Sequence, residues 1–145
     1  MAVTEVKPIA LEEFLIVMAE ITREELTERI AAGKDLIGLD LSWLDLNEAD
    51  LSGANLQNVN LEGADLFKAN LSRANLTKAN LYGAYMFGAN LEGANLTDAN
   101  LTRADLESAN LSHANLTDTN MIGANLSKAS IDKSPAIAIQ ILTKK

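Results

Sequence analysis

A large apolar residue recurs every five positions over most of the chain. Stepping by five from Leu41 to Ile131, every position holds Leu, Met or Ile. Two residues before each stands a small residue, which is Ala except in four units: Leu39, Leu44, Val59 and Thr119. The residue between is Asn or Asp except at Tyr85 and Ser130. Residues 39–133 are therefore nineteen units of the form Ala-(Asn/Asp)-Leu-X-X.

A period of five residues fits neither an α-helix nor a flat strand. On a helix, at about 100° per residue, successive Leu side chains would spread over every face. On a flat strand, Ala and Leu share one face, but the next pair lies on the opposite face. The conflict disappears if the chain turns a corner after each unit, because every Ala and Leu then points inward. The period predicts a stacked coil whose rungs, about 4.8 Å apart, hydrogen-bond like parallel strands.

Glycine supports a corner at the end of each unit. A corner requires backbone angles that glycine adopts without steric cost. Within the repeats, every glycine occupies the last position of a unit: Gly53, Gly63, Gly83, Gly88, Gly93 and Gly123.

The units resemble those of a known family. ADLSG at 49–53, ANLEG at 89–93 and ANLSK at 124–128 resemble the pentapeptide-repeat family, most closely its Leu-centred cyanobacterial type. The resemblance implies an all-β solenoid: a right-handed quadrilateral parallel β-helix of about five coils. It also implies four units per coil, with residue n stacked over residue n+20, and a bacterial source.

Both ends of such a coil need covers because they expose apolar core and unpaired rungs. Residues 1–38 are expected to form a helical segment and cap. The Thr22–Glu25 stretch is a capping-box pattern and Gly33 is a stop signal, which together predict a helix over 22–32. Residues 9–20 are apolar on too many sides for a lone surface helix, so they pack on the cap helix or lie in an interface.

Residues 134–145 are expected to form a C-terminal cap or tail. Ser134 and Pro135 suit the first positions of a helix, which favours a short capping helix. The alternating Ile137, Ile139 and Ile141 suit a strand equally well.

The amino-acid composition limits the classes of molecule that the protein is expected to bind. Twenty acids against twelve bases give a net charge of −8, which disfavours direct binding to nucleic acid or an anionic membrane and favours basic protein surfaces. The absence of cysteine excludes disulfides and thiolate metal sites. No basic region precedes the apolar stretch, as a signal peptide would require, and Ile9–Ile21 is too short to span a bilayer. A cytoplasmic protein is expected.

Catalytic chemistry has little support in the sequence. The single histidine, His113, falls at an outward position, and no nucleophile set or phosphate-binding glycine loop is present. Asn and Asp interchange along the repeat, which acid–base catalysis would not tolerate because Asn does not exchange protons. The interchange indicates hydrogen bonding within the coil. We expect no enzyme activity, cofactor or metal.

The aromatic residues of the repeats fall on two adjacent faces. Twenty-residue stepping places Trp43 and Tyr82 on one face, and Phe67, Tyr85 and Phe87 on the next. Clustered exposed aromatics are typical of binding hot spots, although a stack of rings also shields a solenoid ladder. The second face is acidic as well, and its candidate partner-binding carboxylates are Asp65, Asp105 and Glu107.

Three functions compete. The first is a non-catalytic interaction or regulatory module that binds a protein with a basic surface, as a monomer or homodimer. The second, implied by the family resemblance, is a duplex-DNA mimic that modulates DNA gyrase or another basic DNA-binding protein. Bases such as Arg73, Lys78 and Arg103 interrupt its acids, however, and its centres are Leu rather than Phe. The third is a structural tether that docks through residues 1–21.

Overall fold

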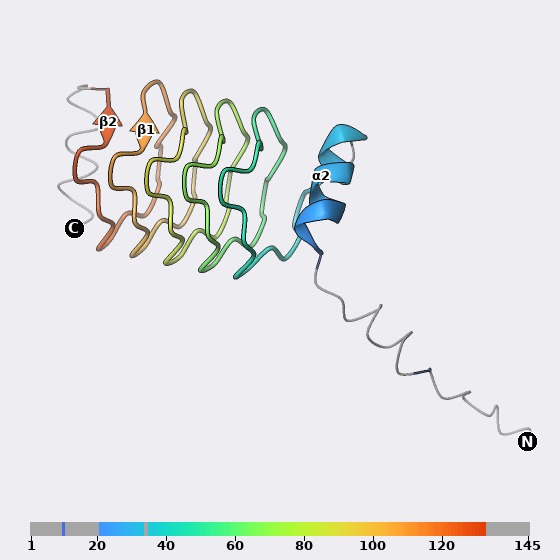
Figure 1. Cartoon of the computed structure of the whole chain (residues 1–145). Coiled ribbons are helices and arrows are strands. Elements are labelled where there is room, and N and C mark those ends of the chain that lie inside the picture. Colours follow the sequence, from blue (N-terminus) through green and yellow to red (C-terminus); the bar gives the residue numbers. More distant parts are fainter. Residues whose placement is uncertain (1–9, 11–20, 34, 133–145) are drawn as a thin grey trace, which may run out of the picture.

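The repeats form a tower of stacked coils with a helix at one end (Figure 1). This computed structural model describes residue 10, residues 21–33 and residues 35–132. The helix is α2 (Arg23–Ala31), and the two strands are β1 (Asn110–Leu111) and β2 (Ser130–Ile131). β1 and β2 pair in parallel, with Asn110 opposite Ser130.

Residues twenty apart lie side by side along the tower. Parallel bridges run in steps of five residues from Asp40–Asn60 to Asp105–Asn125. Each rung both donates and accepts: the Leu76 N–H donates to the Asn95 carbonyl at 2.7 Å, and the Asn95 N–H donates to the Ala74 carbonyl at 2.9 Å. Four units per coil are confirmed. Most sides are single bridges rather than strands, because the turns use up the rest of each five-residue unit.

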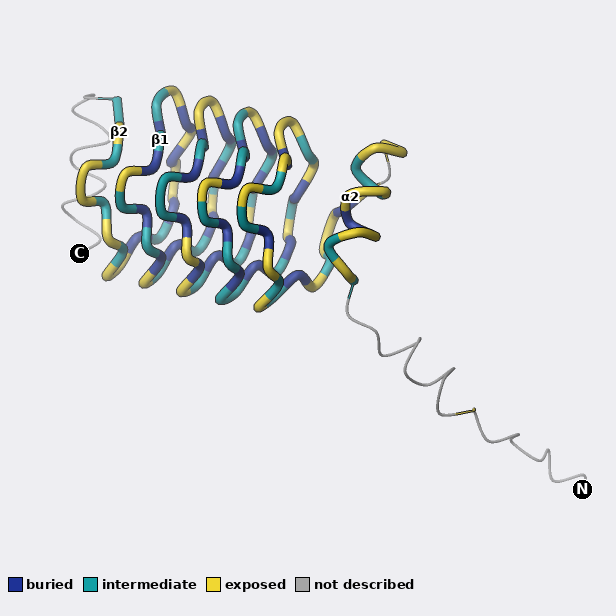
Figure 2. Tube along the Cα trace, in the orientation of Figure 1, coloured by how far each residue is buried: buried dark blue, intermediate teal, exposed yellow. Residues whose placement is uncertain are grey.

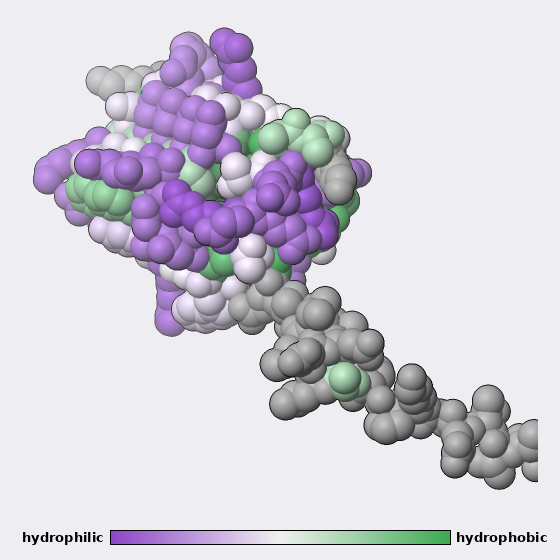
Figure 3. Space-filling view, turned by 45° about the vertical axis from the view of Figure 1, so that its right-hand side comes forward, coloured by the Kyte–Doolittle hydropathy of each residue, from purple (hydrophilic) through white to green (hydrophobic). Residues whose placement is uncertain are grey.

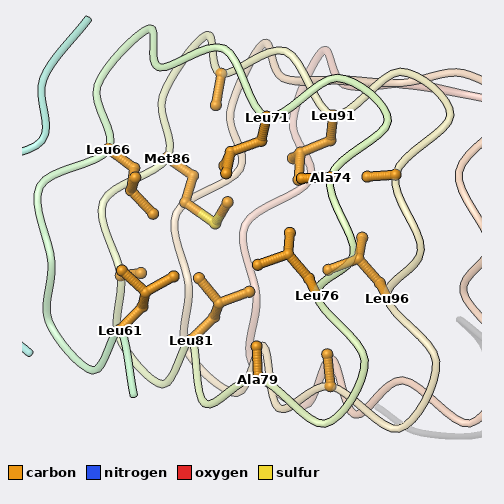
Figure 4. Packing of buried hydrophobic residues seen from close by; sticks show 14 of the residues in the cluster. Leu61, Leu66, Leu71, Ala74, Leu76, Ala79, Leu81, Met86, Leu91 and Leu96 are labelled. Carbon is orange, nitrogen blue, oxygen red and sulfur yellow. The ribbon is translucent and has the colours of Figure 1, made fainter. Parts of the chain in front are cut away.

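Buried residues recur along the coils of the tower (Figure 2), and they are mostly Leu and Ala. Central residues such as Leu61, Leu76 and Met86 are fully buried, and their side chains point toward the axis in Figure 4. The small residues from Val59 onward are equally buried until the last coil. The one buried polar side chain among the described residues is Thr119, whose hydroxyl donates to the Leu96 carbonyl at 2.8 Å.

The first coil is less enclosed than the middle coils. Its small positions are only half-buried, because no full rung lies beneath them: Leu39, Leu44, Ala49 and Ala54. Its central Leu residues are nevertheless buried. Leu26 of α2 is 1% exposed and belongs to the same apolar cluster, so the helix covers the middle of the first coil and leaves part of its rim open.

The helix α2 (Arg23–Ala31) lies where the sequence predicted one over residues 22–32. The Thr22 hydroxyl accepts a hydrogen bond from the Glu25 N–H at 3.1 Å, which caps the first turn. The reciprocal half of the capping box is replaced, because the Glu25 carboxylate pairs with Arg29 at 2.8 Å. Gly33 follows the helix with φ of 63°. The predictions for residues 134–145, and for 9–20 apart from residue 10, lie outside the described residues.

Every corner of the tower uses a left-handed backbone conformation. The last residue of each described unit has positive φ, whether or not it is glycine. Twelve of these positions carry side chains, including Trp43, Lys78 and His113. The sequence pattern located the corners through their glycines, but it did not show that Lys, Arg and Asp adopt the same conformation.

We expect Lys78→Val to lower the free energy of unfolding by about 1–2 kcal/mol, because a β-branched residue tolerates φ near 58° poorly. Lys78→Gly should change it by less than about 1 kcal/mol, since glycine accepts this conformation but loses more entropy on folding. Urea unfolding measures both. Ser72→Val, one position before a corner, is the control; an equal loss there would contradict the role of φ.

Candidate partner-binding site

The Asn side chains form hydrogen-bonded ladders on the tower surface. The Oδ1 atom of Asn80 accepts from the Tyr82 N–H at 3.3 Å, which closes a turn within the unit. Its Nδ2 donates to Asn60 Oδ1 at 3.0 Å in the coil before, and its Oδ1 accepts from Asn100 Nδ2 at 3.1 Å. Each Asn in such a ladder therefore links three rungs and donates toward the N-terminal end.

On two sides an aspartate begins the ladder as an acceptor: Asn60 Nδ2 donates to Asp40 Oδ1 at 2.9 Å, and Asn70 Nδ2 donates to Asp50 Oδ1 at 3.2 Å. The first residue on each of the four sides is an aspartate: Asp35, Asp40, Asp45 and Asp50. A carboxylate only accepts, and the first rung has no rung beneath it to which an Asn could donate. The hydrogen bonds from Ser42, followed by that from Asn60, lower the pKa of the Asp40 carboxyl. Asn and Asp thus interchange for reasons of hydrogen bonding, as the sequence indicated.

One side of the tower breaks the pattern, and we call it the aromatic face. Its centres are Leu46, Leu66, Met86, Leu106 and Leu126, and its ladder positions read Asp45, Asp65, Tyr85, Asp105 and Asn125. Within the described part of the chain, the single rung-to-rung side-chain bond along this ladder column is Asn125 Nδ2 to Asp105 Oδ1 at 3.0 Å. Tyr85 stands where an Asn would donate to Asp65 on the rung beneath.

Three rings gather at this break, which we call the aromatic cluster: Phe67, Tyr85 and Phe87. The ring centroids of Phe67 and Tyr85 are 6.0 Å apart with an interplanar angle of 5°. Phe67 and Phe87 are 5.9 Å apart at 17°, which confirms the stacking expected from their spacing. Tyr85 and Phe87 are 6.5 Å apart at 22°. Tyr85 is 42% exposed, while both Phe side chains are half-buried.

The carboxylates around the aromatic cluster differ in whether a basic side chain pairs with them. Glu107 is paired with Lys128, whose Nζ lies 3.1 Å from Oε1. Asp65 and Asp105 have no basic partner within 4 Å among the residues that the structure describes; Asp105 instead accepts from the Glu107 N–H at 3.1 Å. The Lys68 ammonium lies 5.0 Å from the Phe67 centroid and covers that ring. The exposed part of the cluster thus has two uncompensated acids beside it.

The other two aromatic candidates lie apart from the cluster. Trp43 packs its ring over Gly63, where an added Cβ would collide with it, and the side chain is 74% exposed. The Tyr82 hydroxyl accepts from Arg103 Nη1 at 3.3 Å. Neither ring stacks on the cluster within the described residues. The candidate site is therefore narrower than the sequence indicated, because a corner separates the two faces.

The other residues considered for catalysis or metal binding do not come together in a site within the described part of the chain. His113 is exposed, with Nδ1 3.2 Å from Asp132 Oδ2. Within residues 21–33 and 35–132, no three acidic or histidine side chains converge as metal ligands would. No described helix has the length and apolarity needed to cross a bilayer.

A tower of four-sided coils with a repeated apolar interior and variable outer columns defines a solenoid protein. The family model for pentapeptide repeats matches residues 35–73, 54–93, 64–103 and 99–134, in eight copies. The chain belongs to the pentapeptide-repeat family, whose members form right-handed quadrilateral β-helices. No curated protein matches it.

Solved relatives support this assignment. A pentapeptide repeat protein, Rfr23, of the cyanobacterium Cyanothece 51142 is 40% identical with a TM-score of 0.64, and the match covers 65% of each chain. One from Nostoc Pcc 7120 is 34% identical over 81% of this chain and 91% of that one, with a TM-score of 0.53. One from the Arabidopsis thaliana thylakoid lumen is 28% identical over 77% of each, with a TM-score of 0.54. The match thus spans just under two thirds of the Cyanothece protein.

Proposed function

We propose that this protein is a non-catalytic interaction module whose aromatic cluster, together with Asp65 and Asp105, binds a partner protein with a basic surface. The observation that carries the proposal is the substitution of Tyr85 for a ladder Asn. It gives up the hydrogen bond that an Asn would donate to Asp65 and puts an exposed ring in its place.

A purely protective role explains this cluster less well than binding does. Shielding the coil does not require Tyr85, because Asn protects the equivalent position on the neighbouring sides. Exposed tyrosine is enriched at interface hot spots, where a ring supplies contact area at small entropic cost. Uncompensated carboxylates at the rim steer a basic partner and set its orientation. The cluster and the two aspartates therefore suit one occupant with apolar and basic groups.

The sharpest test restores the repeat at this place. In a Tyr85→Asn, Phe87→Thr variant, the introduced amide should donate to Asp65 and the fold should be retained, because Asn and Thr occupy these two positions in other units of the tower. We expect affinity capture from the native cells to lose the partner that the unchanged protein retains, with at least a tenfold fall in recovered partner. Quantitative mass spectrometry of the captured proteins measures this.

The matched control alters the opposite side of the tower at the same height. Asn95→Tyr, Thr97→Phe creates two rings there without touching the aromatic cluster. This control should keep the partner. If the Tyr85→Asn, Phe87→Thr variant keeps its thermal stability and also its partner, the aromatic cluster is not the binding site.

Mimicry of duplex DNA stays an alternative prediction, and one observation weighs against it. Three successive corners of the second coil carry Lys68, Arg73 and Lys78, which interrupt the acidic surface midway along the tower. A gyrase supercoiling assay separates the two functions: inhibition or protection by this protein at micromolar concentration would favour mimicry. Docking through residues 1–21, a cytoplasmic location and the monomer or homodimer state also stay predictions.

A further inference from the structure

A groove runs between α2 and the lower edge of the first coil, from Glu48 to Asn55, and we call it the entry groove. Two adjoining hollows of about 230 and 480 Å³ make up the groove, and Ile30 lines both. Leu26, Ala49 and Leu51 line the smaller hollow, and Ala54 lines the larger. Figure 3 brings this end of the tower forward and shows hydrophobic surface only in places between hydrophilic side chains.

The backbone along the entry groove offers an open strand edge. In the next coil, the Asn70 and Asn75 N–H groups donate to the rung beneath them at 2.9 Å. Their counterparts in the first coil, the N–H groups of Asp50 and Asn55, have no hydrogen-bond partner among the described residues, and neither has the Ser52 carbonyl. An edge of this kind accepts an added strand.

Hydrogen bonds to the Asn47 and Gln57 carbonyls limit the open edge at both ends. On one side, the Asn47 carbonyl accepts from Arg23 Nη2 of α2 at 2.7 Å. On the other, the Gln57 carbonyl accepts from the Gly38 N–H at 2.9 Å. The unpaired stretch between them therefore has the length of a short peptide segment, and its small residues Ala49 and Ala54 leave room for inward side chains from a strand beneath.

The negative charge around the entry groove favours a positively charged partner segment. Over residues 21–33 and 35–58, eight acids stand against two bases, a net charge of −6. Three acids, Glu48, Asp50 and Asp35, line the groove itself, against one base, Arg23. The first twenty residues of the chain carry four Glu and one Lys, so they would meet like charge in this groove. A basic segment from another protein meets the opposite charge.

We propose that the entry groove binds an extended basic segment of a partner protein, which adds as a partial rung beneath the first coil. Alternate side chains of the segment would point inward onto Ala49 and Leu51, along the side that ends at the Gly53 corner, and the others would carry its positive charge outward toward Glu48 and Asp50. This site meets the aromatic face at Glu48, whose N–H donates to the Phe67 carbonyl at 2.7 Å, but it uses none of the three rings and does not rest on the function proposed for them.

A labelled nine-residue peptide of alternating lysine and valine tests the proposal with the full chain. Fluorescence anisotropy should detect binding at 50 mM salt that weakens as salt rises. A peptide of equal charge with proline in place of the central valines should bind at least tenfold more weakly, because proline lacks the N–H that a strand donates. A glutamate–valine peptide should not bind.

Two matched variants locate the binding. Glu48→Lys with Gly53→Lys adds three positive charges at the groove and should weaken lysine–valine binding at least tenfold. Asp98→Lys with Gly123→Lys adds the same charge at equivalent corners far from the groove and should change binding less than twofold. All four positions have positive φ, and each pair replaces one glycine. Backbone strain therefore affects the two variants equally.

Several results would overturn the proposal. Equal weakening by both variants would mean diffuse electrostatic attraction, and equal binding of the proline peptide would exclude strand addition. If the full chain self-associates in sedimentation experiments and the Glu48→Lys, Gly53→Lys variant does not, the occupant is a second copy. The Tyr85→Asn, Phe87→Thr variant should bind the peptide normally; a loss there would place the peptide on the aromatic cluster instead.

Discussion

Leu76→Ala should lower the free energy of unfolding by about 2–5 kcal/mol, as large-to-small changes do in closed cores. Leu76 has no exposed surface and lies in mid-tower, with the central residues Leu56 and Leu96 on the rungs below and above it. Each rung is tied to its neighbours by backbone hydrogen bonds, so the coil has little freedom to collapse around the cavity. Chemical denaturation followed by circular dichroism measures the loss.

The neighbouring outward residue is the control. Thr77→Ala should cost well under about 1 kcal/mol, because its side chain is half-exposed and loses one hydrogen bond, from Oγ1 to Asn75 Oδ1 at 2.7 Å. Comparable losses for the two variants would show that the inward and outward assignment is wrong.

Ala74→Leu should also destabilise the protein, by about 1–3 kcal/mol, through overpacking. Ala74 has no exposed surface, and Figure 4 shows it inside the coil, in the same interior as Leu71 and Leu76. The rungs are held too close together for a larger side chain to be accommodated by moving one rung. The same denaturation experiment measures the effect.

The matched change lies one coil lower. Ala54 occupies the equivalent position over the entry groove and is half-buried, so Ala54→Leu should cost less than about 0.5 kcal/mol. The chain itself places Leu39 and Leu44 at small positions of this first coil. If Ala54→Leu were as harmful as Ala74→Leu, the first coil would be as tightly enclosed as the second, which would also contradict an open entry groove.

The repeat made most of the fold predictable. One inward residue type at a fixed period leaves a single arrangement that buries every Leu, and the bridges between residues twenty apart confirm it. The helix over 22–32 was predictable for a local reason, since Thr22 and Gly33 act within one turn of their own backbone. The sequence also indicated that the Asn and Asp positions serve hydrogen bonding.

The candidate site was predictable only to the level of a face. Twenty-residue stepping put Phe67 over Phe87, and the rings do stack. It placed Trp43 and Tyr82 near them as well, but side-chain direction around a corner is not a property of spacing. Trp43 lies over Gly63 and Tyr82 bonds to Arg103, so both stay on their own face and do not join the cluster.

The sequence by itself determined the coil, its period and its interior, because burial of a five-residue pattern has one solution and every unit repeats it. Tertiary structure alone decided three things: the direction of the Asn ladders, the three rings that meet at Tyr85, and the edge left open between Arg23 and Gly38. Each of these depends on groups from different coils or from α2. A pattern along the chain carries no information about how such distant groups are finally oriented toward one another.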